Sequence, residues 1–134
     1  MREIMLSEIH NASADKMGAI SLLGIEKAIV DDDSFCVVME ARNVHLNTHG
    51  TVDGGMLYSL CSQAVGSYIA YKKLKAVGAD GSIKYYRPAF SGDVLTAAVH
   101  ERKTGKTIGV YFVELKNQDG KLLADGIFTV MYMN

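Results

Sequence analysis

Several features that mark particular protein classes are scarce or missing in this sequence. With one proline and 49% apolar residues, the composition is that of an ordinary globular domain and excludes a disordered or fibrous chain. The formal net charge is −1, so the excess of basic residues that nucleic-acid binding requires is missing. No apolar run reaches the roughly 18 residues of a membrane span, and residues 1–16 lack the apolar core of a signal peptide. We therefore expect partners other than nucleic acid and membranes.

Cysteine is also scarce. The two cysteines, Cys36 and Cys61, form no CxxC pair, and Cys61 lies within a pattern of apolar residues with helical spacing. This arrangement favours buried free thiols over a disulfide or a zinc site. We expect a cytoplasmic protein that holds neither a metal nor a resident cofactor.

The length of the chain suits a single domain over residues 1–134. Residues 1–23 are expected to form an N-terminal helical segment, which packs onto the rest through Met17, Ile20, Leu22 and Leu23. Alternating or β-branched runs, separated by turn residues, predict strands over 25–30, 34–42, 81–86, 93–102, 107–116 and 121–133. The strongest turn signals are the acidic run at 31–33, the segment 103–106 and the Asp-Gly pair within 117–120.

One long helix is predicted over residues 55–71. Its apolar face comprises Met56, Leu57, Leu60, Cys61, Ala64, Val65 and Tyr68, and its outer face includes Ser62, Gln63 and Ser67. A single long helix beside several antiparallel strands indicates an α+β fold in which the sheet wraps around the helix.

The glycine-rich start of this helix is the most informative feature for chemistry. Gly54 and Gly55 lack Cβ atoms, so a ligand can approach the backbone closely. The first N–H groups of a helix have no partner within it and carry the positive end of its dipole, which can polarise a carbonyl group. From spacing alone, a tight turn into the helix is the favoured explanation of the two glycines, because short glycine motifs often occur without a function. Asp53, just before them, is either the N-cap of the helix or a carboxylate that activates water.

Other polar residues in this region also allow two interpretations. Asn47 either caps a turn or donates its amide N–H to a ligand. His45 and His49 share a loop, but no carboxylate or cysteine completes a metal-binding set. Ser62 has no histidine partner in the sequence that would activate it as a nucleophile, and Gln63 suits an interface.

Basic residues in the second half either are scattered surface charges or bind the phosphates of coenzyme A. The candidates are Lys84, Arg87 and Lys106. Four tyrosines, at positions 58, 68, 85 and 111, either line an acyl tunnel or belong to the core.

Residues 47–70, NTHGTVDGGMLYSLCSQAVGSYIA, resemble the signature of PaaI-like hotdog acyl-CoA thioesterases. Segments IKYYRPAFSGDVLTAAV and TGKTIGVYFVELKNQDGKLLADG are similar to the family's later strands, and the resemblance begins near Met17. It implies the hotdog fold, a curved antiparallel sheet wrapped around one long central helix. It also implies a homodimer or homotetramer in which each active site lies between two subunits.

By this resemblance, Gly55 is the backbone donor to the thioester carbonyl, and Asn47 lies near the reacting water or the acyl group. Substrate-binding roles are expected for His49, Gly54, Gln63, Lys84, Arg87 and Lys106, and coenzyme A enters only as part of the substrate.

Two positions depart from the family pattern. Asp53 stands where the family has the histidine of His-Gly-Gly, and Ser62, followed by Gln63, stands where it has an acidic residue. Either the carboxylate has moved to Asp53, with Ser62 and Gln63 orienting water, or the chain binds an acyl thioester without hydrolysing it. Because a fold does not fix a function, these two hypotheses stay close to each other. A dehydratase or hydratase acting on an acyl thioester is ranked last, because such enzymes resemble a different pattern with a catalytic histidine and an acid in other contexts.

Overall fold

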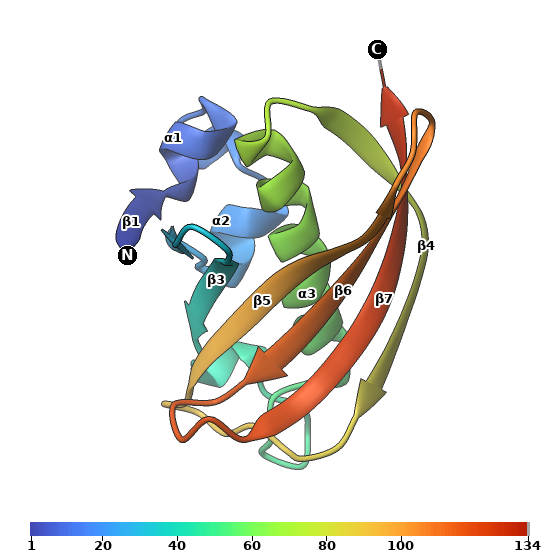
Figure 1. Ribbon diagram of the computed structural model, residues 1–134. Coiled ribbons are helices and arrows are strands. Elements are labelled where there is room, and N and C mark those ends of the chain that lie inside the picture. Colours follow the sequence, from blue (N-terminus) through green and yellow to red (C-terminus); the bar gives the residue numbers. More distant parts are fainter. Residues whose placement is uncertain (134) are drawn as a thin grey trace.

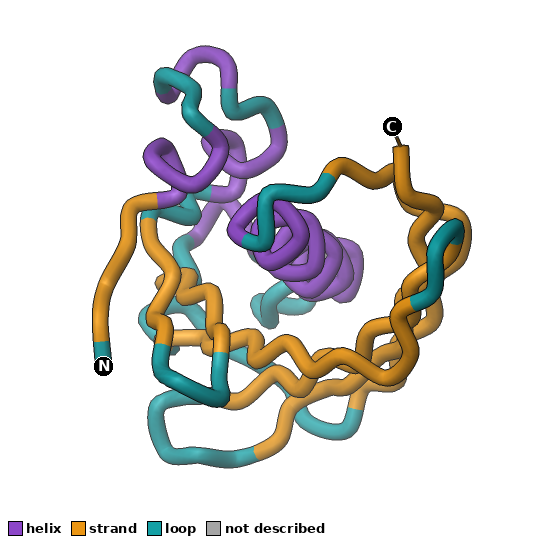
Figure 2. Tube along the Cα trace, turned by 45° about the horizontal axis from the view of Figure 1, so that its top comes forward, coloured by secondary structure: helices purple, strands orange, loops and turns teal. Residues whose placement is uncertain are grey.

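The apolar spacing that predicts a helix over 55–71 is realised as α3 (Gly54–Tyr71). Figures 1 and 2 show α3 running through the middle of the protein with the sheet curved around it. The computed structural model describes residues 1–133. Its strands are β1 (Arg2–Met5), β2 (Lys27–Val30), β3 (Phe35–Glu40), β4 (Lys75–Tyr85), β5 (Val94–Thr104), β6 (Ile108–Lys116) and β7 (Leu122–Met133).

The seven strands form one sheet in the order β1-β2-β3-β5-β6-β7-β4, and all neighbouring pairs are antiparallel. Because β4 follows α3 in the chain but pairs only with β7, the helix crosses the concave face from one part of the sheet to its far edge. The sheet does not close, and β4 leaves a free edge. The α+β hotdog architecture expected from the sequence is confirmed.

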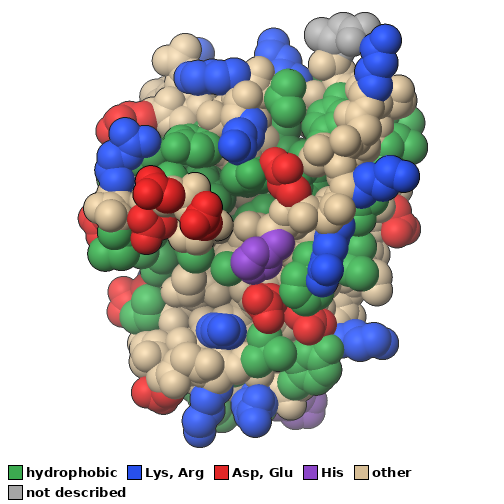
Figure 3. Space-filling view, viewed as in Figure 1, with side chains coloured by type: hydrophobic (Ala, Val, Ile, Leu, Met, Phe, Trp, Pro, Cys, Tyr) green, Lys and Arg blue, Asp and Glu red, His purple; other side chains and the backbone are tan. Residues whose placement is uncertain are grey.

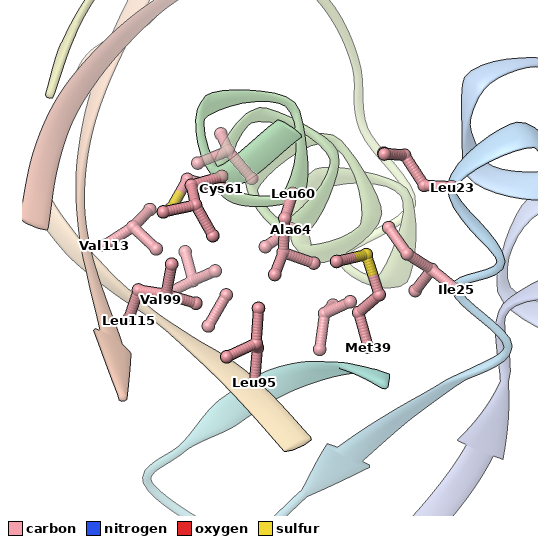
Figure 4. Packing of buried hydrophobic residues seen from close by; sticks show 14 of the residues in the cluster. Leu23, Ile25, Met39, Leu60, Cys61, Ala64, Leu95, Val99, Val113 and Leu115 are labelled. Atoms are coloured by element: carbon pink, nitrogen blue, oxygen red, sulfur yellow. The ribbon is translucent and has the colours of Figure 1, made fainter. Parts of the chain in front are cut away.

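The core lies between α3 and the concave face of the sheet. Figure 4 shows Leu60, Cys61 and Ala64 of α3 directed toward side chains of β3, β5 and β6. Alternate residues of the long strands are buried, as expected for a sheet with one face on the core. The helix residues expected on the apolar face are buried or half-buried. Both cysteines were expected to be buried free thiols. Both are free, but only Cys61 is buried, and Cys36 is half-buried.

The N-terminal segment was expected to be helical, which is only partly right. It contains the short helices α1 (Leu6–His10) and α2 (Ala19–Leu23) and the 3₁₀ turn η1 (Ala14–Lys16), but it begins with β1. Strand β1 forms because it pairs with β2 over four residues, a contact that local sequence does not reveal. Leu22, expected to pack inward, is 81% exposed, because Ile20 and Leu23 share the buried face of α2 at a spacing of three residues.

Strand β4 is longer than predicted. The sequence predicts a strand over 81–86, whereas β4 begins at Lys75. Its first half contains Gly78 and Asp80, residue types that are uncommon in strands. Pairing with β7 overrides this preference, and a bulge between Gly78 and Asp80 accommodates the extra residue.

Candidate active site

Asp53 is the N-cap of α3. Its backbone is extended, and its side-chain Oδ2 accepts a hydrogen bond of 2.9 Å from the backbone N–H of Gly55. This satisfies one of the N–H groups that a helix leaves unpaired at its start. The capping role that the sequence allows for Asp53 is therefore present, and the same bond places a carboxylate next to the proposed carbonyl donor.

The other side of the same peptide group is also held. The hydroxyl of Tyr85, on β4, donates a hydrogen bond of 2.7 Å to the carbonyl oxygen of Gly54. A Cβ atom on Gly54 would lie 3.1 Å from Cζ and from Oη of Tyr85. Glycine at this position therefore allows the close approach of the tyrosine ring.

Asn47 organises the loop before α3. Its side-chain oxygen accepts hydrogen bonds from the backbone N–H groups of His49, at 2.9 Å, and Thr51, at 3.3 Å. Its side-chain nitrogen donates to the hydroxyl of Thr51 at 3.0 Å. The turn-capping interpretation of Asn47 is thus realised, and the amide carries a second N–H. The His49 side chain is exposed on this loop.

His45 is buried, and both of its ring nitrogens lie within hydrogen-bonding distance of backbone groups. It is 1% exposed, its Nδ1 accepts the backbone N–H of Arg42 at 2.9 Å, and its Nε2 lies 2.8 Å from the carbonyl oxygen of Leu23. The carbonyl of His45 in turn accepts the N–H of Asp53 at 2.8 Å. His45 therefore fixes the chain that leads into α3. Within residues 1–133, no three His, Cys, Asp or Glu side chains are arranged to hold a metal ion.

Ser62 and Gln63 lie further along α3, where both are half-buried. They line a groove of about 750 Å³ between α3 and strands β4 and β7, together with Tyr58 and Phe128. The aromatic rings of Tyr58 and Phe128 are 5.4 Å apart, so the groove has an aromatic wall. Of the four tyrosines that the sequence leaves open, Tyr58 lines this groove and Tyr111, 1% exposed, belongs to the core.

One chain does not bring Asp53 and Ser62 together. They are nine positions apart in the sequence, which on an α-helix corresponds to about 13–14 Å along the axis and about half a turn around it. The helix start and the groove are therefore two distinct places in one chain.

The three basic candidates divide between the two ends of the sheet. Lys84 precedes Tyr85 and Arg87 follows it by two positions, so both lie at the end where α3 begins, and both are exposed. Lys106 lies in the β5–β6 turn, at the end where α3 finishes (Figure 1). Figure 3 shows basic and acidic side chains interspersed over one face of the protein.

Arg87 also has a structural contact. Its Nη1 donates to the carbonyl oxygen of Leu122 at 3.1 Å, which ties the segment after β4 to the start of β7. A second contact that the sequence did not predict joins His10 of α1 to Ser67 of α3, with Nε2 and Oγ 3.0 Å apart. Ser67, expected on the outer face of the helix, is fully buried because α1 covers it.

The sequence model of the thioesterase superfamily matches residues 49–124, more than half of the chain. The chain belongs to the thioesterase superfamily. Among curated members, the acyl-coenzyme A thioesterase PaaI of Escherichia coli is 37% identical over 102 residues, which span 76% of this chain and 73% of that protein. In the described part of this thioesterase-superfamily chain, no helix has the length and apolarity needed to cross a membrane.

Two solved structures extend the likeness to the fold. The structure of E. coli PaaI superposes with a TM-score of 0.84 at 31% identity, covering 96% of this chain and 94% of the other. A hypothetical thioesterase from Streptococcus pneumoniae, solved with coenzyme A, superposes with a TM-score of 0.75 at 29% identity, covering 79% and 83% of the two chains. The resemblance to PaaI-like thioesterases is confirmed by these matches.

Proposed function

We propose that this thioesterase-superfamily member hydrolyses an acyl-CoA thioester to the free acid and coenzyme A. The observation that carries the proposal is the start of α3, where Gly54 and Gly55 present backbone N–H groups beside the carboxylate of Asp53. The proposal also draws support from the E. coli relative, named an acyl-coenzyme A thioesterase, and from the S. pneumoniae thioesterase solved with coenzyme A.

In the proposed reaction, the thioester carbonyl oxygen replaces the Asp53 carboxylate as the acceptor of the hydrogen bond from the N–H of Gly55. Asp53 then accepts a proton from a water molecule, whose oxygen attacks the carbonyl carbon. The N–H of Gly55 and the positive end of the α3 dipole stabilise the charge on the tetrahedral oxygen. When the C–S bond breaks, the sulfur of coenzyme A takes the proton from Asp53.

A second subunit completes the site in this proposal. Strand β4 has a free edge 11 residues long, and its side chains are mostly exposed. Antiparallel pairing of two β4 edges turns one subunit end over end relative to the other. Ser62 and Gln63 of one subunit then face the helix start of the other, where they orient the attacking water.

The same pairing gathers the basic residues around coenzyme A. Lys84 and Arg87 lie beside the helix start of their own subunit. The end of the sheet that carries Lys106 in one subunit approaches the helix start of the other. These cations suit the phosphate groups of coenzyme A. His49, exposed on the loop, and Asn47, with its second amide N–H, contact the substrate next to Gly54 and Gly55.

A homotetramer is the larger assembly that we propose. Three apolar side chains on the convex face of the sheet are exposed: Ile108, Ile127 and Met131, at 47%, 49% and 46%. Packing two dimers through this face would remove the apolar surface from water.

The free thiols of Cys36 and Cys61 suit the reducing cytoplasm, which is the compartment that we propose.

Release of free thiol from a panel of short, medium, long and aryl acyl-CoAs tests the proposed activity. We expect hydrolysis of at least one class of acyl-CoA. We also expect the active protein to sediment as an oligomer. Tight binding of acyl-CoA without hydrolysis would instead identify a binding protein, the alternative that the replaced family positions suggest. Full turnover by a monomer would contradict a site shared between subunits.

A further inference from the structure

Two hydrogen bonds hold the peptide group between Gly54 and Gly55, one at each end. The hydroxyl of Tyr85 donates to its carbonyl oxygen at 2.7 Å, and its N–H donates to Oδ2 of Asp53 at 2.9 Å. Because a peptide group is planar, fixing the carbonyl oxygen also fixes the direction of the N–H on the other side. The bond from Tyr85 therefore bears on the direction of the N–H group at which the thioester carbonyl is proposed to bind.

The two bonds have different fates when substrate binds. The carbonyl of the substrate must displace the Asp53 carboxylate from the N–H of Gly55, so that end of the peptide loses its partner. The bond from Tyr85 is on the opposite end and remains. A donor on the carbonyl oxygen also polarises the peptide group and strengthens its N–H as a donor, since linked hydrogen bonds reinforce one another.

The local structure favours this single task for Tyr85. Its ring approaches the backbone of residue 54 closely because Gly54 has no Cβ, and partial burial raises the pKa of its hydroxyl above the usual value. The hydroxyl thus stays protonated, and able to donate, at neutral pH. The next residue, Tyr86, directs its hydroxyl elsewhere, to Oδ1 of Asp125 at 2.8 Å.

Resting on the proposed acyl-CoA hydrolysis, we propose that Tyr85 is a positioning residue that sets the carbonyl-binding N–H of Gly55 by holding the Gly54 carbonyl. It acts through the peptide group rather than on the substrate. Tyr85 also lies on β4, the strand with the free edge, so the same bond ties that edge to the helix start.

The variant Tyr85→Phe removes the hydroxyl alone, and Tyr86→Phe is its matched control on the neighbouring residue. For Tyr85→Phe we expect kcat to fall about three- to tenfold, the effect of losing one hydrogen bond, with KM changed less than about twofold. Tyr86→Phe should retain both constants. Equal kcat values for Tyr85→Phe and the wild type would overturn the proposal. So would a loss of kcat/KM that comes entirely from a higher KM.

Nuclear magnetic resonance of the ligand-free protein tests the same bond without any turnover. In Tyr85→Phe, the carbonyl carbon signal of Gly54 and the amide signal of Gly55 should shift, and in Tyr86→Phe both should stay in place. If the wild type hydrolyses no acyl-CoA, the proposed function fails, and these signals still decide whether Tyr85 positions the peptide. Unchanged signals in Tyr85→Phe overturn it.

Discussion

Asp53 and Gly55 are hydrogen-bonded to each other at the start of α3, where Oδ2 of Asp53 accepts a bond of 2.9 Å from the backbone N–H of Gly55. The proposed base and the proposed donor to the thioester carbonyl are therefore hydrogen-bonded to each other. A carbonyl oxygen that gains negative charge cannot share this N–H with a carboxylate at low cost, so substrate binding requires the Asp53 side chain to turn away. The same rotation frees the carboxylate to accept a proton from water.

The capping bond predicts a difference between two variants of Asp53. Asp53→Ala should lower the free energy of unfolding by about 0.5–2 kcal/mol, whereas Asp53→Asn should lower it much less, because asparagine caps helices about as well as aspartate. Urea denaturation followed by circular dichroism measures both. Equal losses in the two variants would mean that the bond to Gly55 contributes little to stability.

Restoring an acid at the helix position should raise turnover. Ser62 lines the groove between α3 and strands β4 and β7, and the resemblance to PaaI-like thioesterases implies a carboxylate at its position. Ser62→Asp should increase kcat/KM about tenfold or more, since a general base typically contributes at least a hundredfold when it is well placed. Ser62→Asn, similar in size and uncharged, is the control. If the two variants have the same rate, this part of the groove does not face the reacting carbonyl.

Acid should weaken the attachment of the N-terminal segment through His10. Its Nε2 lies 3.0 Å from Oγ of the fully buried Ser67, and burial lowers the pKa of His10 below its ordinary value of 6.5. The unfolded chain then binds the proton more readily than the folded one, so stability is full above about pH 6.5. It declines as the pH falls below that value and levels off under the folded-state pKa.

The variant His10→Gln, which does not titrate, should flatten this part of the curve when unfolding by urea is measured from about pH 5 to pH 8. Identical pH dependence in the wild type and His10→Gln would show that His10 titrates alike in both states.

The two thiols should differ in reactivity. Burial, and secondarily the charge of Asp125, raises the pKa of Cys61 to about 12, and burial also raises the pKa of the half-buried Cys36. Because the thiolate is the reactive form, a disulfide reagent at about pH 8 should modify Cys36 first and Cys61 only after unfolding. Mass spectrometry of the labelled protein assigns each site. Labelling of native Cys61 as fast as Cys36 would contradict its burial.

The helix and most strands could be predicted because their signals are local. The spacing of Leu57, Leu60 and Ala64 specifies one face of α3, and the Asp-Gly turn marks the boundary between β6 and β7. Strand β1 and the first half of β4 could not be predicted. Both are strands because a distant segment pairs with them, and Gly78 and Asp80 argue locally against a strand.

The candidate site divides in the same way. The capping role of Asp53 is readable because it involves a residue two positions away. Tyr85 reaches Gly54 across 31 positions, and His10 reaches Ser67 across 57, so neither contact has a local signal. The sequence also gives no indication of which hydroxyl, that of Tyr85 or that of Tyr86, turns toward the helix.

Thiol release by the wild type and by Asp53→Asn, measured side by side on the acyl-CoA that the wild type prefers, tests the central claim most directly. The variant keeps a capping side chain but cannot accept a proton from water. The account predicts that kcat falls about a hundredfold to ten-thousandfold while the fold and the binding of acyl-CoA are retained. Wild-type turnover in a folded Asp53→Asn protein would show that Asp53 only caps α3 and that another group activates the water.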